Sequence, residues 1–405
     1  MPVRLLSVAL VVFVSALPAV ADDWPQFRGP NAAGRYASDQ PLPADIGPDQ
    51  HVVWKTELPP GHSSPVLVGD RIYLTAVRDD RLLTLAIDRT TGEVVWEALA
   101  PQCEMEEIHT IGSHAQSSVA TDGEYVVSFF GSYGLLCYDA AGRELWRQPM
   151  GPFSNSFGAG SSPILVDQRL ILNQDHDVDS FLTAIDVRTG NTIWRNDRSE
   201  FPRGYATPVI WENDGERQIV VAGTLRIVGY DFETGAERWT VRGVSRITNM
   251  TPVVGDDGTL YVAAWAPGGD DTNRIEVPDF DSLIERGDEN EDGSLQIDEV
   301  PTGPLSIRFS QIDRDKSGAI TRAEYDSMRT IFHSARNVLL AIKPGGAGDV
   351  TDTHVLWRYD RSLPYAPSPV IYQDLLFLVE DGVFVCCFAA DSGEPHRRAR
   401  VAGTA

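Results

Sequence analysis

Positive charge is scarce in this sequence of 405 residues, where 34 lysines and arginines stand against 58 aspartates and glutamates and leave a net charge of −24. Phosphate binding needs clustered basic side chains, so this balance excludes a general nucleic-acid binder. Cysteine is also rare, with four residues and no Cys-x-x-Cys metal pair. The Gly-x-Ser-x-Gly, phosphate-loop and dinucleotide-binding patterns do not occur, which removes the common hydrolase and nucleotide-binding signatures.

Long apolar runs are missing as well. The run Leu5–Leu17 is too short to cross a bilayer, which takes about 20 residues, and no other stretch is a candidate. It follows Arg4 and ends at Ala19-Val20-Ala21, the order of a secretory signal peptide, so we expect cleavage before Asp22. An uncleaved N-terminal anchor is the alternative. The mature chain is expected to be periplasmic or extracellular, with no membrane span.

The spacing of the cysteines does not predict a framework of disulfides. Cys137 and the adjacent Cys386 and Cys387 lie inside apolar strand patterns, which is typical of small buried side chains. A vicinal bridge between Cys386 and Cys387 is the alternative.

Two short phrases recur along the chain. The first contains Asp, then a turn ending in Gly, then Trp four residues after the Gly, and its tryptophans are 50, 48 and 45 residues apart. Its copies are Asp88…Gly92…Trp96, Asp139…Gly142…Trp146, Asp186…Gly190…Trp194 and Asp231…Gly235…Trp239. The second phrase precedes each unit as Ser64-Pro65-Val66, Ser118-Val119, Ser162-Pro163-Ile164, Thr207-Pro208-Val209, Thr251-Pro252-Val253 and Ser368-Pro369-Val370.

Each unit holds about four short strands separated by Gly, Asp and Asn turns. Four-stranded units of this length predict an all-β fold, a β-propeller. Both faces of each small sheet must be covered, and in a propeller the neighbouring blades cover them. The Gly supplies a positive φ for the turn, and we expect the following Trp to fasten one blade to the next.

The units Ala86–Trp96 and Ala184–Trp194 resemble the pyrroloquinoline-quinone (PQQ) repeat of quinoprotein dehydrogenases and BamB-like proteins. The opening residues 23–30 also resemble the start of secreted BamB-like proteins, and the resemblance covers residues 22–270 and 335–400. It implies eight blades, whereas six units are visible here. The last unit has Ala389 and Arg397 in place of Asp and Trp, and Val52-Val53-Trp54 resembles the outer strand of a further blade. We therefore expect a truncated, open ring, with closure by fewer blades as the alternative.

One unit is interrupted by an acidic insertion, because Trp239 and Trp357 are 118 residues apart. Residues 288–299 and 313–324 both match the twelve-residue calcium loop of an EF-hand, D-x-[DN]-x-[DN]-G-x5-E, with Ser317 as the oxygen at position five of the second loop. The ligand positions are Asp288, Asn290, Asp292, Ser294, Gln296 and Glu299 in the first loop, and Asp313, Asp315, Ser317, Ala319, Thr321 and Glu324 in the second.

This spacing suits Ca2+, which takes six to eight oxygen ligands. Positions seven, Ser294 and Ala319, offer backbone carbonyls, and positions nine, Gln296 and Thr321, act through water. We expect two calcium sites. The first exit helix must be short, and residues 322–337 are expected to form the last helix with Met328, Ile331, Phe332 and Ala335 inward. The predicted parts are residues 1–21, 22–50, 51–269, 270–336 and 337–405: signal peptide, extended segment, first blades, EF-hand pair and remaining blades.

Two functions remain open. The first is a non-catalytic exported scaffold that binds other exported or outer-membrane proteins, or a polysaccharide, and needs no PQQ. The second is the PQQ-dependent dehydrogenase activity implied by the resemblance. Weaker candidates for a site are Glu106, His109 and His114 in a long connection, and the acidic hairpin around Asp175-His176-Asp177, which we interpret as a polar tip.

Overall fold

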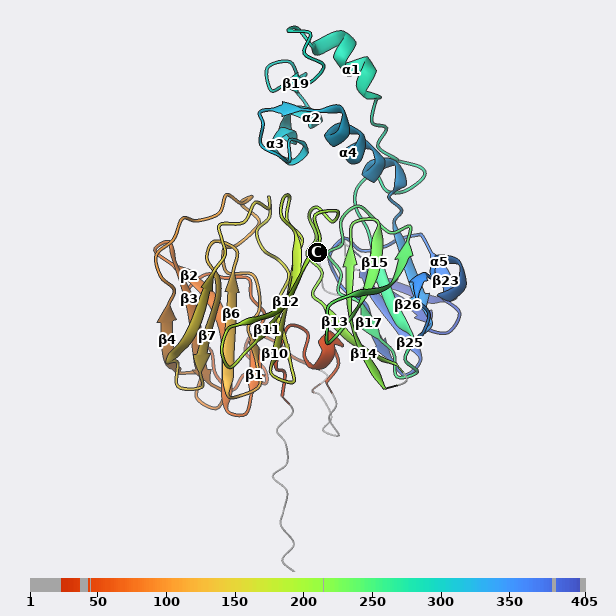
Figure 1. The fold of residues 1–405 in the computed structure, drawn as a ribbon. Helices are drawn as coiled ribbons and strands as arrows, with labels where there is room; N and C mark the ends of the chain where they lie inside the picture. The colour runs from red at the N-terminus through yellow and green to blue at the C-terminus, as the bar shows by residue number, and fades with distance from the viewer. Residues whose placement is uncertain (1–22, 37–42, 44, 214, 381–383, 401–405) are drawn as a thin grey trace, which may run out of the picture.

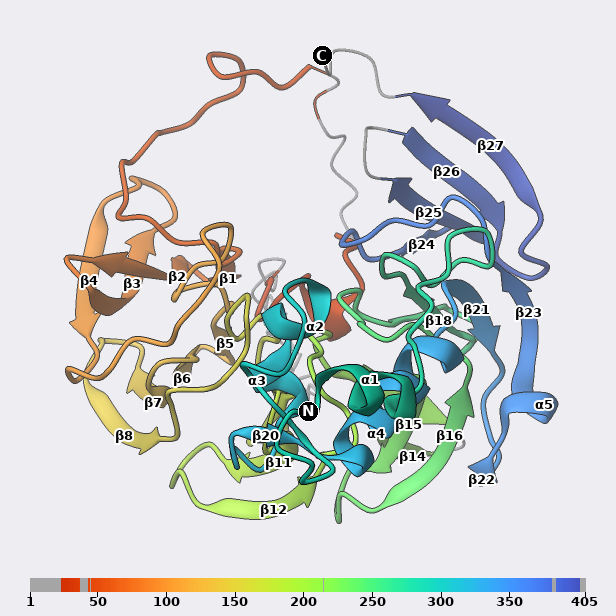
Figure 2. The same ribbon diagram turned by 90° about the horizontal axis from the view of Figure 1, so that it is seen from above.

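Strands account for most of the regular structure in the computed structural model, which describes residues 23–400 except 37–42, 44, 214 and 381–383. The predicted signal peptide lies outside these residues. Six sheets follow one another around an axis, each with four antiparallel strands in chain order or its reverse, and one of them carries a short fifth strand (Figures 1 and 2). The fold is therefore the predicted β-propeller, and we number its blades 1 to 6. Within the described residues, no helix is long and apolar enough to cross a membrane.

Blades 1 to 3 are continuous in sequence. Blade 1 comprises β1 (Val66–Val68), β2 (Arg71–Arg78), β3 (Arg81–Asp88) and β4 (Val94–Leu99). Blade 2 comprises β5 (Ala120–Thr121), β6 (Tyr125–Phe130), β7 (Gly134–Asp139) and β8 (Glu144–Pro149). Blade 3 comprises β9 (Ile164–Val166), β10 (Arg169–Gln174), β11 (Phe181–Asp186) and β12 (Thr192–Asp197).

Blades 4 to 6 include the interrupted unit. Blade 4 comprises β13 (Val209–Asn213), β14 (Glu216–Gly223), β15 (Arg226–Asp231) and β16 (Glu237–Arg242), with the short β22 (Gly348–Asp349) added in parallel to β16. Blade 5 comprises β17 (Val253–Val254), β18 (Leu260–Ala264), β21 (Val338–Ile342) and β23 (Val355–Tyr359), preceded by α5 (Thr351–His354). Blade 6 comprises β24 (Val370–Tyr372), β25 (Leu375–Glu380), β26 (Phe384–Ala389) and β27 (Pro395–Arg400).

Burial along the strands follows from stacking of the blades. The third strands β7 and β11 are buried at five consecutive positions, because both of their faces meet a neighbouring blade. The outer strands β4, β8 and β12 alternate between exposed and half-buried positions. The large apolar cores of the propeller lie between neighbouring blades, as where Val66 and Tyr73 of blade 1 pack with Val126 and Leu136 of blade 2. Burial of such side chains is the main favourable contribution to folding.

The second recurrent phrase links the blades in a hydrogen-bonded series around the axis. The backbone amide of each phrase donates to the hydroxyl of the next, so that Ser64 binds Ser118 at 3.0 Å and Ser118 binds Ser162 at 2.9 Å. The series continues through Thr207 and Thr251 to Ser368. Ser and Thr recur there because only a small hydroxyl residue both fits the crowded inner edge and accepts from the neighbouring amide.

The first phrase fastens the blades at their outer edge. Gly92, Gly142, Gly190, Gly235 and Gly393 all have φ between 70° and 82°, and a Cβ on any of them would come within 2.5–2.8 Å of a Trp ring from the preceding unit. The partners are, in order, Trp54, Trp96, Trp146, Trp194 and Trp357. The Gly is needed both for the turn and for the close approach of the indole. The predicted Trp contact between blades is confirmed.

Trp239 departs from this pattern. It is buried within blade 4 against Trp211, with ring centroids 5.4 Å apart, and its indole donates to Gln218 at 2.6 Å. The next blade has no Asp-x-x-Thr-Gly turn to receive it, since β22 pairs along β16 instead.

The ring is open between blades 6 and 1 in Figure 2. Trp54, predicted to belong to the outer strand of a further blade, makes the expected contact with blade 1, where its indole donates to the carbonyl of Arg89 at 2.8 Å. Its surroundings are not a strand in the structure, because no sheet pairs with residues 51–57.

The N-terminal segment, residues 23–35, crosses the face of the ring opposite the insertion and includes the short helix η1 (Pro30–Ala32) (Figure 1). Trp24 pairs with Leu67 of blade 1, Asn31 with Ile210 of blade 4, and Arg28 donates to the carbonyl of Pro369 in blade 6 at 2.6 Å. This one segment therefore ties distant blades together across the axis.

The insertion leaves blade 5 between β18 and β21 and lies above the ring (Figure 1). It contains α1 (Phe280–Gly287), β19 (Leu295–Gln296), α2 (Pro304–Ile307), α3 (Phe309–Ile312), β20 (Ala319–Ile320) and α4 (Arg322–Ser334). Its own small core includes Phe280, Leu295, Ile312, Ile320 and Tyr325. The first exit helix, α2, is short as predicted.

Candidate metal centre

The two acidic loops lie side by side in the insertion. Leu295 and Ile320, at position eight of each loop, face each other in the two-stranded pairing of β19 with β20. Helix α1 leads into the first loop, with Asp279 as its N-cap accepting from the amide of Ser282. Helix α4 leaves the second loop, with a capping box between Thr321 and Glu324. Helix α1 thus holds the start of the first loop, and helix α4 holds the end of the second.

The second loop gathers three carboxylates. One oxygen each from Asp313, Asp315 and Glu324 lie within 4.8 Å of one another. Asp313 is only 6% exposed, and within the described residues it has no cationic side chain paired with it. The hydroxyl of Ser317 lies 3.1 Å from the carbonyl oxygen of Ala319 at position seven. Carboxylate, hydroxyl and carbonyl oxygens therefore converge at this loop.

The same backbone contacts orient the first and twelfth carboxylates in both loops. Asp288 and Asp313 each accept from the amides at positions five and six of their own loop, at 2.9–3.1 Å. Glu299 and Glu324 each accept from the amides at positions two and nine, at 2.8–3.0 Å. These contacts hold the side chains in place and leave further lone pairs on the oxygens for a cation.

The oxygens of the first loop are less free. The amide of Asn290 donates to Asp292 and to Gln296, both at 3.0 Å, and the amide of Gln296 donates to Asp292 at 2.8 Å. A hydrogen bond from Ser294 lowers the pKa of Asp292, so this carboxylate is held ionised. The predicted ligands of the first loop are thus close together but hydrogen-bonded to one another.

The donor set fits a hard divalent cation. All twelve predicted positions offer oxygen, from carboxylates, two side-chain amides, hydroxyls or backbone carbonyls, and Gly293 and Gly318 adopt φ of 80° and 87° at the turn of each loop. Such donors suit Ca2+ and are unsuited to soft metals. The ligands of each loop, from Asp288 to Glu299 and from Asp313 to Glu324, would hold one ion. The bound ion would supply a positive centre that draws the two ends of that loop together.

Helix α4 differs from the sequence prediction at its end. It stops at Ser334, and Met328 packs in the core of the insertion as expected. Phe332, predicted to point inward, is buried, and it lies under the guanidinium groups of Arg246 and Arg308, 4.8 and 5.8 Å from its ring centroid. Helix α4 therefore packs on both sides: one face contacts the core of the insertion and the other contacts the propeller.

The connection before blade 2 places its candidates apart. Glu106 is buried, with its carboxylate 4.0 Å from Nδ1 of His114, and burial raises the pKa of Glu106. His109 stacks obliquely on Phe157 with centroids 5.5 Å apart. Neither group joins the acidic loops.

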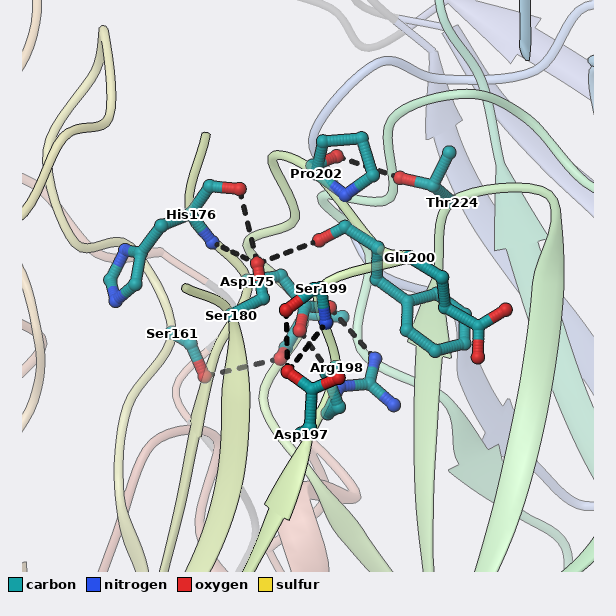
Figure 3. Close-up of polar contacts among 12 residues, drawn as sticks. Ser161, Asp175, His176, Ser180, Asp197, Arg198, Ser199, Glu200, Pro202 and Thr224 are labelled. Atoms are coloured by element: carbon teal, nitrogen blue, oxygen red, sulfur yellow. Dashed lines mark hydrogen bonds and ion pairs between the residues drawn. The ribbon is translucent and has the colours of Figure 1, made fainter. Parts of the chain in front are cut away.

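The segment Asp175-His176-Asp177 is not the polar tip that its sequence indicated, because all three side chains are buried. Asp175 forms a two-fold ion pair with Arg198 at 2.8 Å, and both side chains have 0% exposure. Asp177 pairs with Arg203. Figure 3 shows the His176 ring pointing away from this polar group, while the hydroxyl of Ser180 bridges the backbone of His176 and Phe201. Paired carboxylates of this kind are structural.

The cysteines form no disulfide, since Cys103, Cys137, Cys386 and Cys387 are all free thiols. Adjacent residues of β26 point to opposite faces of the sheet. Cys386 is buried and lies 2.7 Å from the carboxylate of Glu380, and burial raises the pKa of its thiol to about 12. Cys137 and Cys386 are buried packing groups, as the strand pattern indicated, whereas Cys103 and Cys387 are only half-buried.

The repeat region of this chain is similar to known proteins. The family model described as outer membrane protein assembly factor BamB matches residues 85–268. Outer membrane protein assembly factor BamB of Alkalilimnicola ehrlichii is 30% identical over 152 residues, which are 37% of this chain and 36% of that protein. The match thus spans about a third of the length of this curated relative.

Solved structures with a similar arrangement include BamB from Moraxella catarrhalis, 15% identical with a TM-score of 0.47 over 83% of this chain and 75% of that one. Quinohemoprotein alcohol dehydrogenase from Comamonas testosteroni is 16% identical with a TM-score of 0.46 over 95% and 74% of the two chains. The segment matched by the family model runs from β3 to β18 of the propeller.

Proposed function

We propose that this chain is an exported β-propeller that binds calcium through an EF-hand pair in its insertion and acts as a non-catalytic scaffold for other exported or outer-membrane proteins. The observation that carries the calcium part is the convergence of Asp313, Asp315 and Glu324, whose oxygens lie within 4.8 Å of one another. Three like charges so close together repel one another unless a cation neutralises them.

The two loops differ in how well their ligands are arranged. In the second loop three carboxylates already converge, whereas in the first loop Asn290, Asp292 and Gln296 must exchange hydrogen bonds with one another for bonds to the ion. We therefore assign the tighter site to residues 313–324 and the weaker one to residues 288–299. Exported modules of this type bind Ca2+ with Kd on the order of 0.1–1 mM.

Calcium titration by calorimetry on the mature chain tests this assignment. Two sites are expected, with Glu324→Gln removing the tighter one and Glu299→Gln the weaker one, because each change removes a ligand oxygen's charge at position twelve. Glu291→Gln is the matched control, since it makes the same change at position four, which supplies no ligand in this type of loop. Absence of binding at millimolar calcium would overturn the proposal.

The scaffold part rests on the similarity of residues 85–268 to an outer membrane protein assembly factor and on the signal-peptide pattern of residues 1–21. Propellers hold their blades rigidly and present loops on two faces, which suits protein contacts. The buried ion pairs and thiols of the blades are satisfied structural groups. The same calcium-loaded protein, supplied with PQQ, an alcohol and an electron-accepting dye, is expected to show no dye reduction. Turnover would replace the scaffold with a quinoprotein dehydrogenase.

A further inference from the structure

A cavity of about 400 Å³ lies between the underside of the insertion and the face of the propeller. Loops of blades 2 to 4 line one side, including Phe157 and Arg203, and helices α3 and α4 line the other, including Gln311 and Phe332. Across this space, the amide of Gln311 donates to the hydroxyl of Ser156 at 3.3 Å. The volume falls within the range typical of sites for small ligands.

The cavity is positively charged although the protein is strongly acidic. Four arginines and two carboxylates line it, which leaves a formal excess of two positive charges in a chain of net charge −24. Both carboxylates are already engaged. Asp177 accepts two hydrogen bonds from Arg203, and Glu324 accepts from amides of its own loop.

Arg246 is the incompletely satisfied member of this group. One terminal nitrogen donates to the carbonyl of Pro267 at 3.1 Å, whereas its Nε is buried with no hydrogen-bond partner. Within the described residues, no carboxylate forms an ion pair with Arg246. Burial and the nearby charge of Arg308 lower the pKa of Arg246 to about 10. Two guanidinium groups are therefore held close together on one Phe332 ring, an arrangement that an anion would stabilise.

Much of the remaining lining is apolar. Phe157, Ile247, Met328 and Ile331 contribute side chains to it, and Ile307 at its rim is 77% exposed. A phosphate or sulfate would contact the arginines and leave these apolar groups in water. A ligand that satisfies both parts needs one anionic group and an apolar body.

We propose that this cavity binds an organic carboxylate with an apolar body, whose carboxylate contacts Arg246 and Arg308 and whose apolar part lies along Phe157, Ile247 and Met328. The ligand is either the chain end of a peptide or a free alkyl carboxylic acid, since both present this chemistry. The site requires residues of the insertion and of the propeller together, so it exists only in the assembled chain. It does not depend on the scaffold assignment.

Binding of four probes to the full mature chain in calcium-free buffer, followed by ligand-observed NMR or calorimetry, tests the site. N-acetyl-leucine represents a peptide chain end, hexanoate represents a free acid, N-acetyl-leucinamide lacks the charge, and inorganic phosphate lacks the apolar body. Binding of either carboxylate, with the amide and phosphate at least about tenfold weaker, supports the site because a charge-assisted hydrogen bond has this magnitude. The tighter of the two carboxylates identifies the source.

Arg246→Met keeps the apolar stem over Phe332 and removes the charge, so binding should fall about tenfold or more. Arg242→Met, in the exposed pair with Asp349, is the matched control and should bind as the wild type does. Arg308→Met provides the second variant if Arg246→Met does not fold. Equal binding of acid and amide, phosphate binding as tight as that of the carboxylates, unchanged binding in both cavity variants, or no binding of either carboxylate would overturn the proposal.

Discussion

The indole of Trp96 lies across Gly142 of the next blade, so close that a Cβ on Gly142 would be 2.6 Å from the Trp ring. The indole also donates to the carbonyl of Ala140 at 3.1 Å, in the same turn. One Trp thus both covers a turn and hydrogen-bonds to it, and the equivalent contact recurs at Gly92, Gly190 and Gly393. The spacing of Gly and Trp in the repeat follows from this contact between units.

Gly142→Ala should destabilise the propeller by about 2–4 kcal/mol. The added Cβ overlaps Trp96, and φ of 82° is unfavourable for a residue with a side chain. Gly258→Ala separates the two effects, because Gly258 has φ of 80° but no atom within 4 Å of its Cβ position, so it should cost only about 1 kcal/mol. Urea unfolding measures both. Equal costs would show that the Trp contact contributes little.

Arg198→Met should destabilise the fold by about 3–5 kcal/mol, because it leaves the carboxylate of Asp175 buried without its partner. Arg198 also donates to the hydroxyl of Tyr230 and lies 4.0 Å from the ring of Phe201. The double variant with Asp175→Leu removes both charges and should recover most of the loss. Denaturant midpoints of the two single variants and the double variant give the coupling. A double variant no more stable than Arg198→Met would contradict this account.

The acid sensitivity of the fold should depend on His176. Burial, with the charge of Arg195, lowers the pKa of His176 to about 3, and both ring nitrogens are buried without a hydrogen-bond partner. The unfolded chain takes up a proton below pH of about 6.5, whereas the folded chain does so only near 3. Folding stability from this residue is therefore complete above pH of about 6.5 and is lost as the pH falls toward 3.

His176→Leu removes this dependence, so the variant should gain about 2 kcal/mol relative to wild type between pH of about 7 and 5. Leu keeps an apolar contact with Phe153, whose ring stacks on His176 at 4.0 Å. Urea midpoints at the two pH values measure the change. His62→Leu, at an exposed histidine, is the control, and its stability relative to wild type should be the same at the two pH values. If the stability of His176→Leu relative to wild type is the same at both pH values, His176 is not the source of the acid sensitivity.

Features that depend on local spacing were predictable. The Gly, the Trp and the Ser/Thr phrase recur in the sequence at regular distances, and apart from Trp239 the structure uses them for repeated contacts between units. The positions of the two acidic loops were predictable for the same reason, since their ligands lie within twelve consecutive residues. The propeller and its short-helix insertion therefore follow from pattern alone.

Contacts between distant segments were not predictable. Arg246 and Phe332 are far apart in the chain, and the prediction that Phe332 points inward did not identify Arg246 as its partner. Asp175 meets Arg198 only because β10 and β12 lie on either side of β11. A hairpin of polar residues indicates an exposed tip unless the arginines that bury it are known. The unexpected direction of Trp239 has the same origin, because β22 arrives from beyond the insertion.

Calcium should stabilise the insertion and leave the propeller unchanged. The insertion has its own small core around Phe280, Leu295 and Tyr325, separate from the cores between blades, so it is expected to unfold as a separate unit. A ligand that binds only the folded form adds about 2.7 kcal/mol at a concentration one hundred times Kd. Calorimetry should show a first transition that moves to higher temperature with calcium and a second that does not.

Two variants sharpen this test. Glu324→Gln should remove most of the calcium-dependent shift, whereas Glu291→Gln should retain it, because only the former is at position twelve of the loop with three converging carboxylates. Limited proteolysis should give the same order, with calcium protecting the segment between α1 and α4 in wild type and in Glu291→Gln. A shift of both transitions together would mean that the insertion and the propeller unfold as one unit, and a shift of neither would remove calcium from the account.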